Sequence, residues 1–230
     1  MSQALVIAHR GASAREVENS LAAFRAAGAL GADAVELDVH ATADGALFVH
    51  HDETVGALHH IPHLAAQRVR ELRLPNGEPI PTLAEALVAA GPKLQVFVEV
   101  KSLAPRFDDR LFDVLAGGPN PSGYAVHGFD HRIVRRLGLE RPGLRCGVLS
   151  SSYLVKPLAA LEDAGATILW QERRLVDKAL VDTLHGAGMQ ILVWTVDDAA
   201  EMRGLLELGV DGICTNLPDV GRRTVDALAA

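Results

Sequence analysis

The chain has 230 residues, of which 49% are hydrophobic and 22% are charged. This composition excludes a chain that is disordered as a whole, and the length is enough for one large domain with a substantial core. The 22 Lys and Arg residues against 29 Asp and Glu residues give a net charge of −7, which argues against nucleic acid as a partner.

The first apolar run, residues 4–8, is followed directly by His9 and Arg10. It is shorter than a signal-peptide core of about 7–15 residues and much shorter than a membrane span of about 20. We therefore expect a cytoplasmic protein without integral membrane association. Cys146 and Cys214 lie in two separate strand-like runs, a pattern typical of buried thiols rather than of a disulfide framework.

Apolar runs rich in β-branched residues alternate with amphipathic segments along the chain. Strands are predicted at residues 5–9, 34–39, 94–100, 124–129, 145–149, 167–170, 190–196 and 211–215. Helices are predicted at residues 20–29, 82–89, 107–115, 133–137, 153–164, 176–187, 198–208 and 218–229. Strand then helix, repeated eight times, predicts an α/β fold of the (β/α)8 TIM barrel type. An open doubly wound sheet is the alternative, but its GxGxxG turn is absent from the chain.

One spacing departs from this regular alternation. The second and third strands begin about 60 residues apart, whereas a strand–helix–strand unit needs about 30. Within the gap, Asp44-Gly45 predicts a two-residue hairpin loop, and counting outward from it places His51 opposite Asp38. We therefore expect one domain over residues 1–230, with an insertion at about 52–81 between strands two and three.

Three acidic side chains lie near the C-terminal ends of predicted strands, where barrel enzymes build their active sites. Glu36 and Asp38 face the same side of strand two, and Glu99 lies on strand three. Buried charge is costly unless paired, so a divalent cation is the expected partner. Oxygen ligands favour Mg²⁺ or Ca²⁺ over Zn²⁺, although an added imidazole would weaken this preference. The alternative is a structural ion network with Arg10 and Lys101.

Two histidines and two cationic side chains complete the predicted cluster. His9 and His51 each lie beside a charged residue and near the expected metal, a pattern typical of a general acid and base. Arg10 and Lys101 can bind a phosphate, Arg through its planar fork and Lys as a point charge. The set indicates metal-assisted chemistry on a phosphate ester.

Weaker features have two interpretations each. The tract 59–63 is rich in His but most simply forms a solvated loop, with a contribution to a substrate rim as the alternative. Asn19 or Ser20 can cap the first helix, and Glu18 beside them can face the site. Trp194 fits either core packing or an aromatic wall for the leaving alcohol.

The order and spacing of these motifs resemble those of the glycerophosphodiester phosphodiesterase family from end to end. The resemblance implies a TIM barrel with a small insertion after strand two. It also implies that His9 and His51 form the acid/base pair and that Glu36, Asp38 and Glu99 bind the metal. By the same resemblance, Arg10 and Lys101 bind the phosphodiester. The motifs are His9-Arg10-Gly11, Glu18-Asn19-Ser20, Glu36-Leu37-Asp38-Val39, His51-Asp52, Val98-Glu99-Val100-Lys101, Val193-Trp194-Thr195-Val196 and Gly209-Val210-Asp211-Gly212-Ile213.

The chain departs from the family pattern at two places. Val17 stands where the family usually has Pro before Glu-Asn-Thr, which should mainly alter loop stiffness. After the fourth strand, where the family commonly shows Ser-Phe, the sequence is His127-Gly128-Phe129. A missing hydroxyl and a new imidazole near the pocket should change substrate selectivity more than the reaction.

The resemblance implies metal-dependent hydrolysis of a glycerophosphodiester, a small-molecule substrate, to glycerol 3-phosphate and an alcohol. The alternatives are a lysophospholipid-cleaving phosphodiesterase of the same fold and a barrel that binds phosphodiesters without catalysis. An aldolase or isomerase would need a Schiff-base lysine, and Lys101 is a poor candidate because Glu99 favours its protonated form. The sequence leaves open the ion, the division of roles between the histidines and the oligomeric state.

Overall fold

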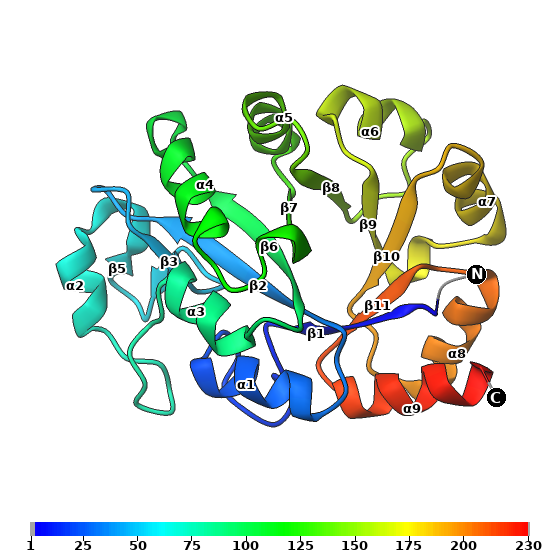
Figure 1. Ribbon diagram of the computed structural model, residues 1–230, viewed down its shortest axis with the longest axis horizontal. Coiled ribbons are helices and arrows are strands. Elements are labelled where there is room, and N and C mark those ends of the chain that lie inside the picture. Colours follow the sequence, from blue (N-terminus) through cyan, green and yellow to red (C-terminus); the bar gives the residue numbers. More distant parts are fainter. Residues whose placement is uncertain (1–2, 230) are drawn as a thin grey trace.

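A computed structural model describes residues 3–229. Eight parallel strands form a closed barrel in the order β1-β11-β10-β9-β8-β7-β6-β2, and pairing of β1 with β2 closes the ring (Figure 1). This confirms the predicted TIM barrel. The strands are β1 (Leu5–His9), β2 (Ala34–Ala41), β6 (Gln95–Ser102), β7 (Tyr124–Gly128), β8 (Arg145–Ser150), β9 (Ile168–Glu172), β10 (Gln190–Trp194) and β11 (Gly212–Thr215).

Helices surround the barrel, as Figure 1 shows for α5 to α9. Side chains with a hydrogen-bonding oxygen begin several of them: Ser20 caps α1, and Thr82 forms a capping box with Glu85 at the start of α3. Within residues 3–229, no helix is long and apolar enough to cross a membrane. The helices are α1 (Leu21–Ala29), α2 (Ala66–Glu71), α3 (Leu83–Ala90), α4 (Asp108–Ala116), α5 (His131–Glu140), α6 (Pro157–Ala164), α7 (Lys178–Gly186), α8 (Ala199–Leu208) and α9 (Pro218–Ala229).

The barrel has two apolar layers because alternate residues of each strand face opposite sides. Outward-facing residues such as Leu37 and Val98 pack against the helices in the main core. Inward-facing residues fill the barrel with a second cluster that includes Ile7, Phe97 and Trp170. Apolar side chains therefore fill the middle of the barrel, and the inward-facing polar side chains lie towards the strand ends.

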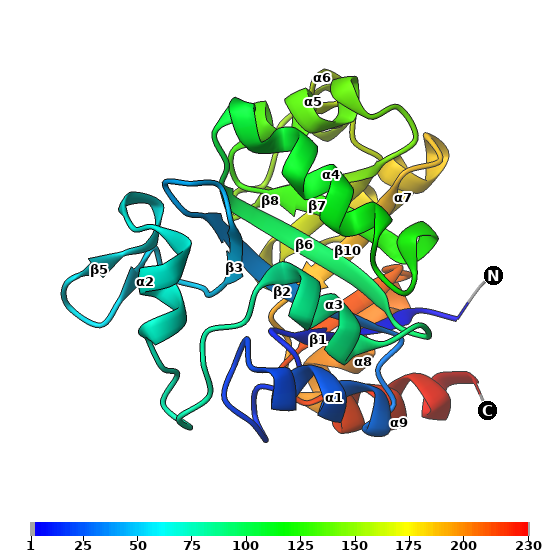
Figure 2. The same ribbon diagram turned by 60° about the vertical axis from the view of Figure 1, so that its left-hand side comes forward.

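Between β2 and α3 the chain forms a small lobe beside the barrel (Figure 2). Strand β3 (Leu47–Val49) pairs antiparallel with β2, as predicted, and β4 (Thr54–Val55) pairs with β5 (His59–His60). Helix α2, which the sequence did not predict, packs here. The lobe has its own apolar cluster, formed by Phe48, Ile61, Val69, Leu74 and Ile80.

The predicted register of the β2–β3 hairpin is wrong by one residue. Val39 is opposite Val49, and the His50 backbone N–H donates to the Asp38 carbonyl oxygen at 3.1 Å, so Asp38 faces His50 rather than His51. The loop contains three residues rather than two: the Thr42 backbone N–H donates to the Ala46 carbonyl oxygen at 2.9 Å, and the loop between them ends at Gly45, which has a φ of +83°. His51 therefore lies beyond the paired strand and reaches the site from the connecting chain.

Several other boundaries differ from the prediction, and two of these differences have a clear local cause. Helix α6 begins at Pro157 rather than at Tyr153, since proline is favoured in the first turn of a helix and the preceding residues form a loop. Strand β2 continues to Ala41, two residues beyond its predicted end, because it pairs with β3.

Gly11, directly after His9 and Arg10, is needed for its backbone conformation and for space. Its φ is +80°, and a Cβ atom there would lie 2.7 Å from Ala23 Cβ. We expect Gly11→Ala to lower the free energy of unfolding by about 2–4 kcal/mol, because strain and a backbone clash add. Gly77→Ala is the matched control: Gly77 has a φ of +84° with nothing within 4 Å, so it should cost about 1 kcal/mol. If urea denaturation showed the same decrease in the free energy of unfolding for both variants, the clash at Gly11 would have no role.

Candidate active site

The predicted polar residues gather in one cavity at the C-terminal ends of the barrel strands. Asp38 lies buried behind this cavity, and Glu18 lies at the surface, where it contacts Arg10. The other predicted residues line it directly. The lining comprises His9, Arg10, Glu36, His51, Glu99, Lys101 and Trp194, together with His127, Phe129, Leu149, Trp170 and Cys214.

Strand register explains why these side chains meet. His9 of β1 pairs with Glu36 of β2, and Glu99 of β6 is the partner of both Asp38 and His127 on its two neighbouring strands. Register partners in a parallel sheet project to the same face. All five side chains therefore point into the barrel from two successive levels: His9 lies beside Glu36, and Glu99 lies between Asp38 and His127.

Asp38 forms ion pairs with the two cationic side chains of the site, Arg10 and Lys101. Its carboxylate lies 3.1 Å from Lys101 Nζ and 3.2 Å from Arg10 Nε, and Asn19 Nδ2 donates to it at 2.8 Å. Burial opposes ionisation of Asp38, but Lys101 and Arg10 together outweigh it and lower the pKa to about 2. Asp38 is therefore ionised, and its Oδ1 atom, although close to Lys101, accepts no hydrogen bond within the described chain.

The negative charges of Glu36 and Glu99 are less well balanced by neighbouring cationic groups than that of Asp38. Burial, reinforced by the charge of Asp38, raises the pKa of Glu99 to about 7 and raises that of Glu36 well above its usual range. Glu36 accepts a hydrogen bond from the Arg10 backbone N–H at 3.1 Å, and Glu99 lies 2.7 Å from Lys101 Nζ. Lys101, with two carboxylates beside it, has a raised pKa despite its burial. A protonated Lys101 cannot act as a Schiff-base nucleophile.

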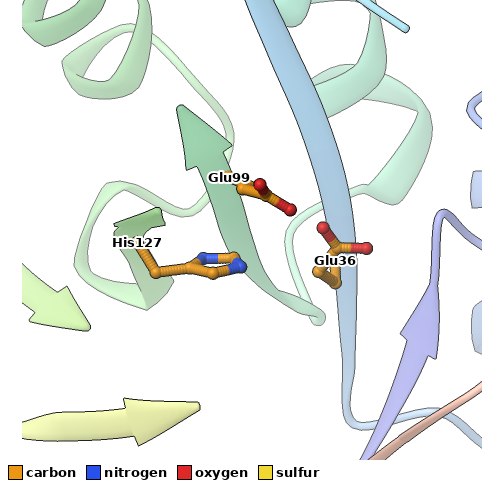
Figure 3. Close-up of side chains that lie close together, drawn as sticks. All are labelled: Glu36, Glu99 and His127. Atoms are coloured by element: carbon orange, nitrogen blue, oxygen red, sulfur yellow. The ribbon is translucent and has the colours of Figure 1, made fainter. Parts of the chain in front are cut away.

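Glu36, Glu99 and His127 could together hold a metal ion (Figure 3). One ligand atom from each lies within 4.8 Å of the others, and all three side chains are buried. Burial lowers the pKa of His127 to about 3, so its imidazole is neutral and retains a lone pair. The donor set of two carboxylates and one imidazole fits a divalent cation. Asp38, predicted as the third carboxylate ligand, is not part of this group and pairs instead with Lys101 and Arg10.

His9 is fixed by a chain of hydrogen bonds. Asn216 donates through Nδ2 to Asp197 at 2.7 Å, which leaves its Oδ1 to accept from His9 Nδ1 at 2.7 Å. The Nδ1 proton is thereby assigned, and Nε2 carries the lone pair. Burial and the neighbouring Arg10 lower the pKa of His9, which favours the neutral imidazole.

His51 has a different environment. Its Nδ1 lies 2.7 Å from the carboxylate of Asp52, and the side chains of His51 and Asp52 are 36% and 73% exposed. This histidine lies at the open side of the cavity, where an exposed carboxylate orients its ring.

Sequence reasoning placed most of the site but missed the supporting residues. Asn19 was interpreted as a possible helix cap, whereas Ser20 is the cap and Asn19 binds Asp38. The Asp197 side chain gave no sequence signal. His127 was noticed as a departure from the family pattern near the pocket. Alternate residues of a strand face the same side, and this alternation could have identified His127 as inward-facing like its strand partner Glu99.

A (β/α)8 barrel with carboxylates, cations and imidazoles at its C-terminal mouth defines an enzyme of the TIM-barrel class with a charged active site. A sequence profile of the Glycerophosphoryl diester phosphodiesterase family matches residues 9–220. The chain belongs to this family, and it is therefore a phosphoric diester hydrolase.

Individual relatives agree with the family match. A glycerophosphodiester phosphodiesterase of Caldanaerobacter subterraneus subsp. tengcongensis is 33% identical over 94% of this chain and 95% of its own. A crystal structure of a glycerophosphodiester phosphodiesterase from Parabacteroides distasonis has 26% identity and a TM-score of 0.89 over 99% of both chains. An Oleispira antarctica phosphodiesterase, solved with the product sn-glycerol-3-phosphate, has the same fold, with a TM-score of 0.89 at 23% identity over 96% of both chains.

Asn19 tests the support of the carboxylate cluster. Its side chain is 1% exposed and donates to Asp38, and its φ is +56°. We expect Asn19→Ala to lower the free energy of unfolding by about 1–3 kcal/mol, since a buried charged acceptor loses a hydrogen bond. Asn76→Ala, which removes an exposed contact to Glu78, should change it by less than about 0.5 kcal/mol. Urea denaturation of both variants measures the difference, and a neutral Asn19→Ala would refute this role.

Proposed function

We propose that the protein hydrolyses glycerophosphodiesters to glycerol 3-phosphate and an alcohol, with a divalent cation and two histidines. The family fixes the reaction class, and one observation carries the rest: three imidazoles, two cationic side chains and two carboxylates line one cavity, with the buried Asp38 in contact with both cationic side chains. A purely structural ion network would not require His9 and His51 in the lining of that cavity, each oriented through Nδ1.

Glu36, Asp38 and Glu99 are the proposed metal ligands. The burial of all three carboxylates and the raised pKa values of Glu36 and Glu99 support this assignment, because a bound cation would stabilise the ionised forms. When bound, a divalent ion such as Mg²⁺ or Ca²⁺ supplies positive charge that stabilises the developing charge on the phosphoryl oxygens and acidifies the glycerol hydroxyl.

Four side chains are proposed to bind the substrate. Arg10 and Lys101 bind the phosphodiester oxygens, while Asp38 keeps both cationic groups in place. Glu18 orients the Arg10 guanidinium, which it contacts at 2.9 Å. Trp194 provides an aromatic wall for the leaving alcohol, together with Phe129, whose ring meets the indole edge-on at a centroid distance of 5.7 Å.

The hydrogen-bond geometry divides the roles of the two histidines. His9 is the proposed base, because its Nδ1 proton is committed to Asn216 and its lowered pKa keeps Nε2 free to accept a proton. His51 is the proposed acid, with its ring oriented by the Asp52 carboxylate 2.7 Å from Nδ1. His51 also lies on the solvent side, where an alcohol can leave.

The proposed reaction has two steps. His9 removes the proton from the glycerol 2-hydroxyl, the oxygen attacks phosphorus, and His51 protonates the oxygen of the departing alcohol. This forms a cyclic glycerol phosphate. Water then attacks phosphorus with the histidines in reversed roles, and the ring opens to glycerol 3-phosphate.

A lysophospholipid is the second candidate substrate. Phe129, although it lines the cavity, is 49% exposed and stands beside Trp194 at the mouth, where an acyl chain could pack. Turnover of lysophosphatidylcholine above that of glycerophosphocholine would favour this class, and the reverse ranking would favour the small diesters.

Alanine substitution tests the histidine pair. We expect His9→Ala and His51→Ala each to lower kcat for glycerophosphocholine by about 10²–10⁴-fold, because each removes one proton transfer. His185→Gln, which changes a surface histidine on α7, should retain wild-type turnover. The assay measures released glycerol 3-phosphate, and circular dichroism verifies the fold. Near-normal kcat in both folded variants would refute the pair.

Metal removal tests the cation. Incubation with a chelator should reduce glycerol 3-phosphate release to background, and addition of Mg²⁺ or Ca²⁺ should restore it, since the ion stabilises charge in the transition state. Dialysis without chelator controls for inactivation during handling. Full activity of protein that is shown by elemental analysis to be metal-free would contradict the proposal.

A further inference from the structure

We propose that His127 supplies a nitrogen ligand to the divalent cation, so that this chain binds its metal with three carboxylates and one imidazole. The inference rests on the proposed function, in which Glu36, Asp38 and Glu99 hold a cation. It changes the chemical character of the site from a set of oxygen donors to a mixed oxygen and nitrogen set.

The first argument is the position of the imidazole. Ligand atoms of Glu36, Glu99 and His127 lie within 4.8 Å of one another, which is the spacing of atoms that share one ion. Figure 3 shows the ring of His127 reaching from β7 towards the two carboxylates. Glu99 and His127 are also register partners on adjacent strands, so the backbone itself holds them side by side.

The second argument is a polar ring atom without a protein partner. His127 is 1% exposed, and its Nδ1 makes no hydrogen bond within residues 3–229. Burying a polar atom without a partner is costly, and an apolar side chain would fill the same space without this cost. A cation bound at Nδ1 would remove this penalty.

The third argument is the packing that fixes the ring plane. The indole of Trp170 stacks on His127 with centroids 4.4 Å apart and an interplanar angle of 9°. Trp170 reaches His127 across Gly147 of the intervening strand, where a Cβ atom would lie 2.9 Å from Trp170 Cδ1 and 3.2 Å from His127 Cβ. Phe97 packs edge-on against the Trp170 indole, with the two ring centroids 5.1 Å apart. The stack orients the imidazole as hydrogen bonds orient metal-binding histidines elsewhere.

An imidazole donor has a measurable consequence for ion preference. Oxygen-only sites suit Mg²⁺ and Ca²⁺, whereas an imidazole donor raises the affinity for first-row transition ions relative to Mg²⁺, least for Mn²⁺ and more for Co²⁺ and Zn²⁺. We therefore expect the protein to bind Mn²⁺ more tightly than Mg²⁺, and to lose most of this difference when His127 is replaced.

Pulsed electron paramagnetic resonance of bound Mn²⁺ tests the inference without reference to activity, because it detects a directly ligated ¹⁴N nucleus. The samples are the wild-type protein, His127→Gln and the control His185→Gln. His185 lies on the surface of α7, where it contacts Asp211. We expect ¹⁴N modulation in the wild type and His185→Gln and none in His127→Gln. Calorimetry should show Mn²⁺ affinity reduced about tenfold or more in His127→Gln, with a smaller change for Mg²⁺.

The outcomes separate the two proposals. Mn²⁺ bound without ¹⁴N modulation, or with modulation that persists in His127→Gln, would overturn the role of His127 and leave the carboxylate site standing. Failure of the wild type to bind either ion would overturn the metal dependence itself. If His127→Gln does not fold, ring ¹⁵N resonances of the wild-type protein provide the test: those of His127 should shift on addition of Zn²⁺, and unshifted resonances would refute the inference.

Discussion

The active site depends on how three buried carboxylates share two cations. Asp38 contacts both Arg10 and Lys101 and is strongly ionised, while Glu36 and Glu99 have raised pKa values because they lie near Asp38 with less compensation. The carboxylates therefore differ in their surroundings: Asp38 pairs with Arg10 and Lys101, the two groups proposed to bind phosphate, whereas Glu36 and Glu99 have less positive charge beside them. One cavity can thus present positive groups to a phosphate and negative groups to a metal without the two sets neutralising each other completely.

The barrel and the main site residues could be predicted because both depend on local patterns. Alternation within β2 and β6 places Glu36, Asp38 and Glu99 on the inward face whatever the details of packing. The repeated strand–helix order then requires all C-terminal strand ends to meet at one mouth. These are constraints of the backbone, and a sequence displays them directly.

The parts that could not be predicted depend on single-residue geometry or on tertiary neighbours. The β2–β3 register differs from the predicted one by one residue because the loop that ends at Gly45 has three residues. The Asp44-Gly45 sequence fits a two-residue and a three-residue loop equally well. Asp197 contributes through Asn216, which lies far along the chain from His9. The contact of Trp170 with His127 needs an empty glycine position on the strand between them.

The two histidines divide the site into a rigid side and a variable side. His9 is held through Asn216 by Asp197, whose carboxylate also accepts from Thr215 at 2.9 Å, so the β1–β11 side of the barrel fixes its orientation. The imidazole of His51, on the segment that leaves the β2–β3 hairpin, is hydrogen-bonded to the exposed Asp52. The glycerol phosphate part of a substrate is common to every diester, whereas the alcohol varies. In the proposed reaction, His9 acts on the shared glycerol phosphate and the more exposed His51 acts on the variable alcohol, so different leaving groups would not disturb the carboxylate cluster. Differences in alcohol selectivity should therefore arise from the lobe between β2 and α3 and from the Phe129–Trp194 wall, rather than from the charged core of the site.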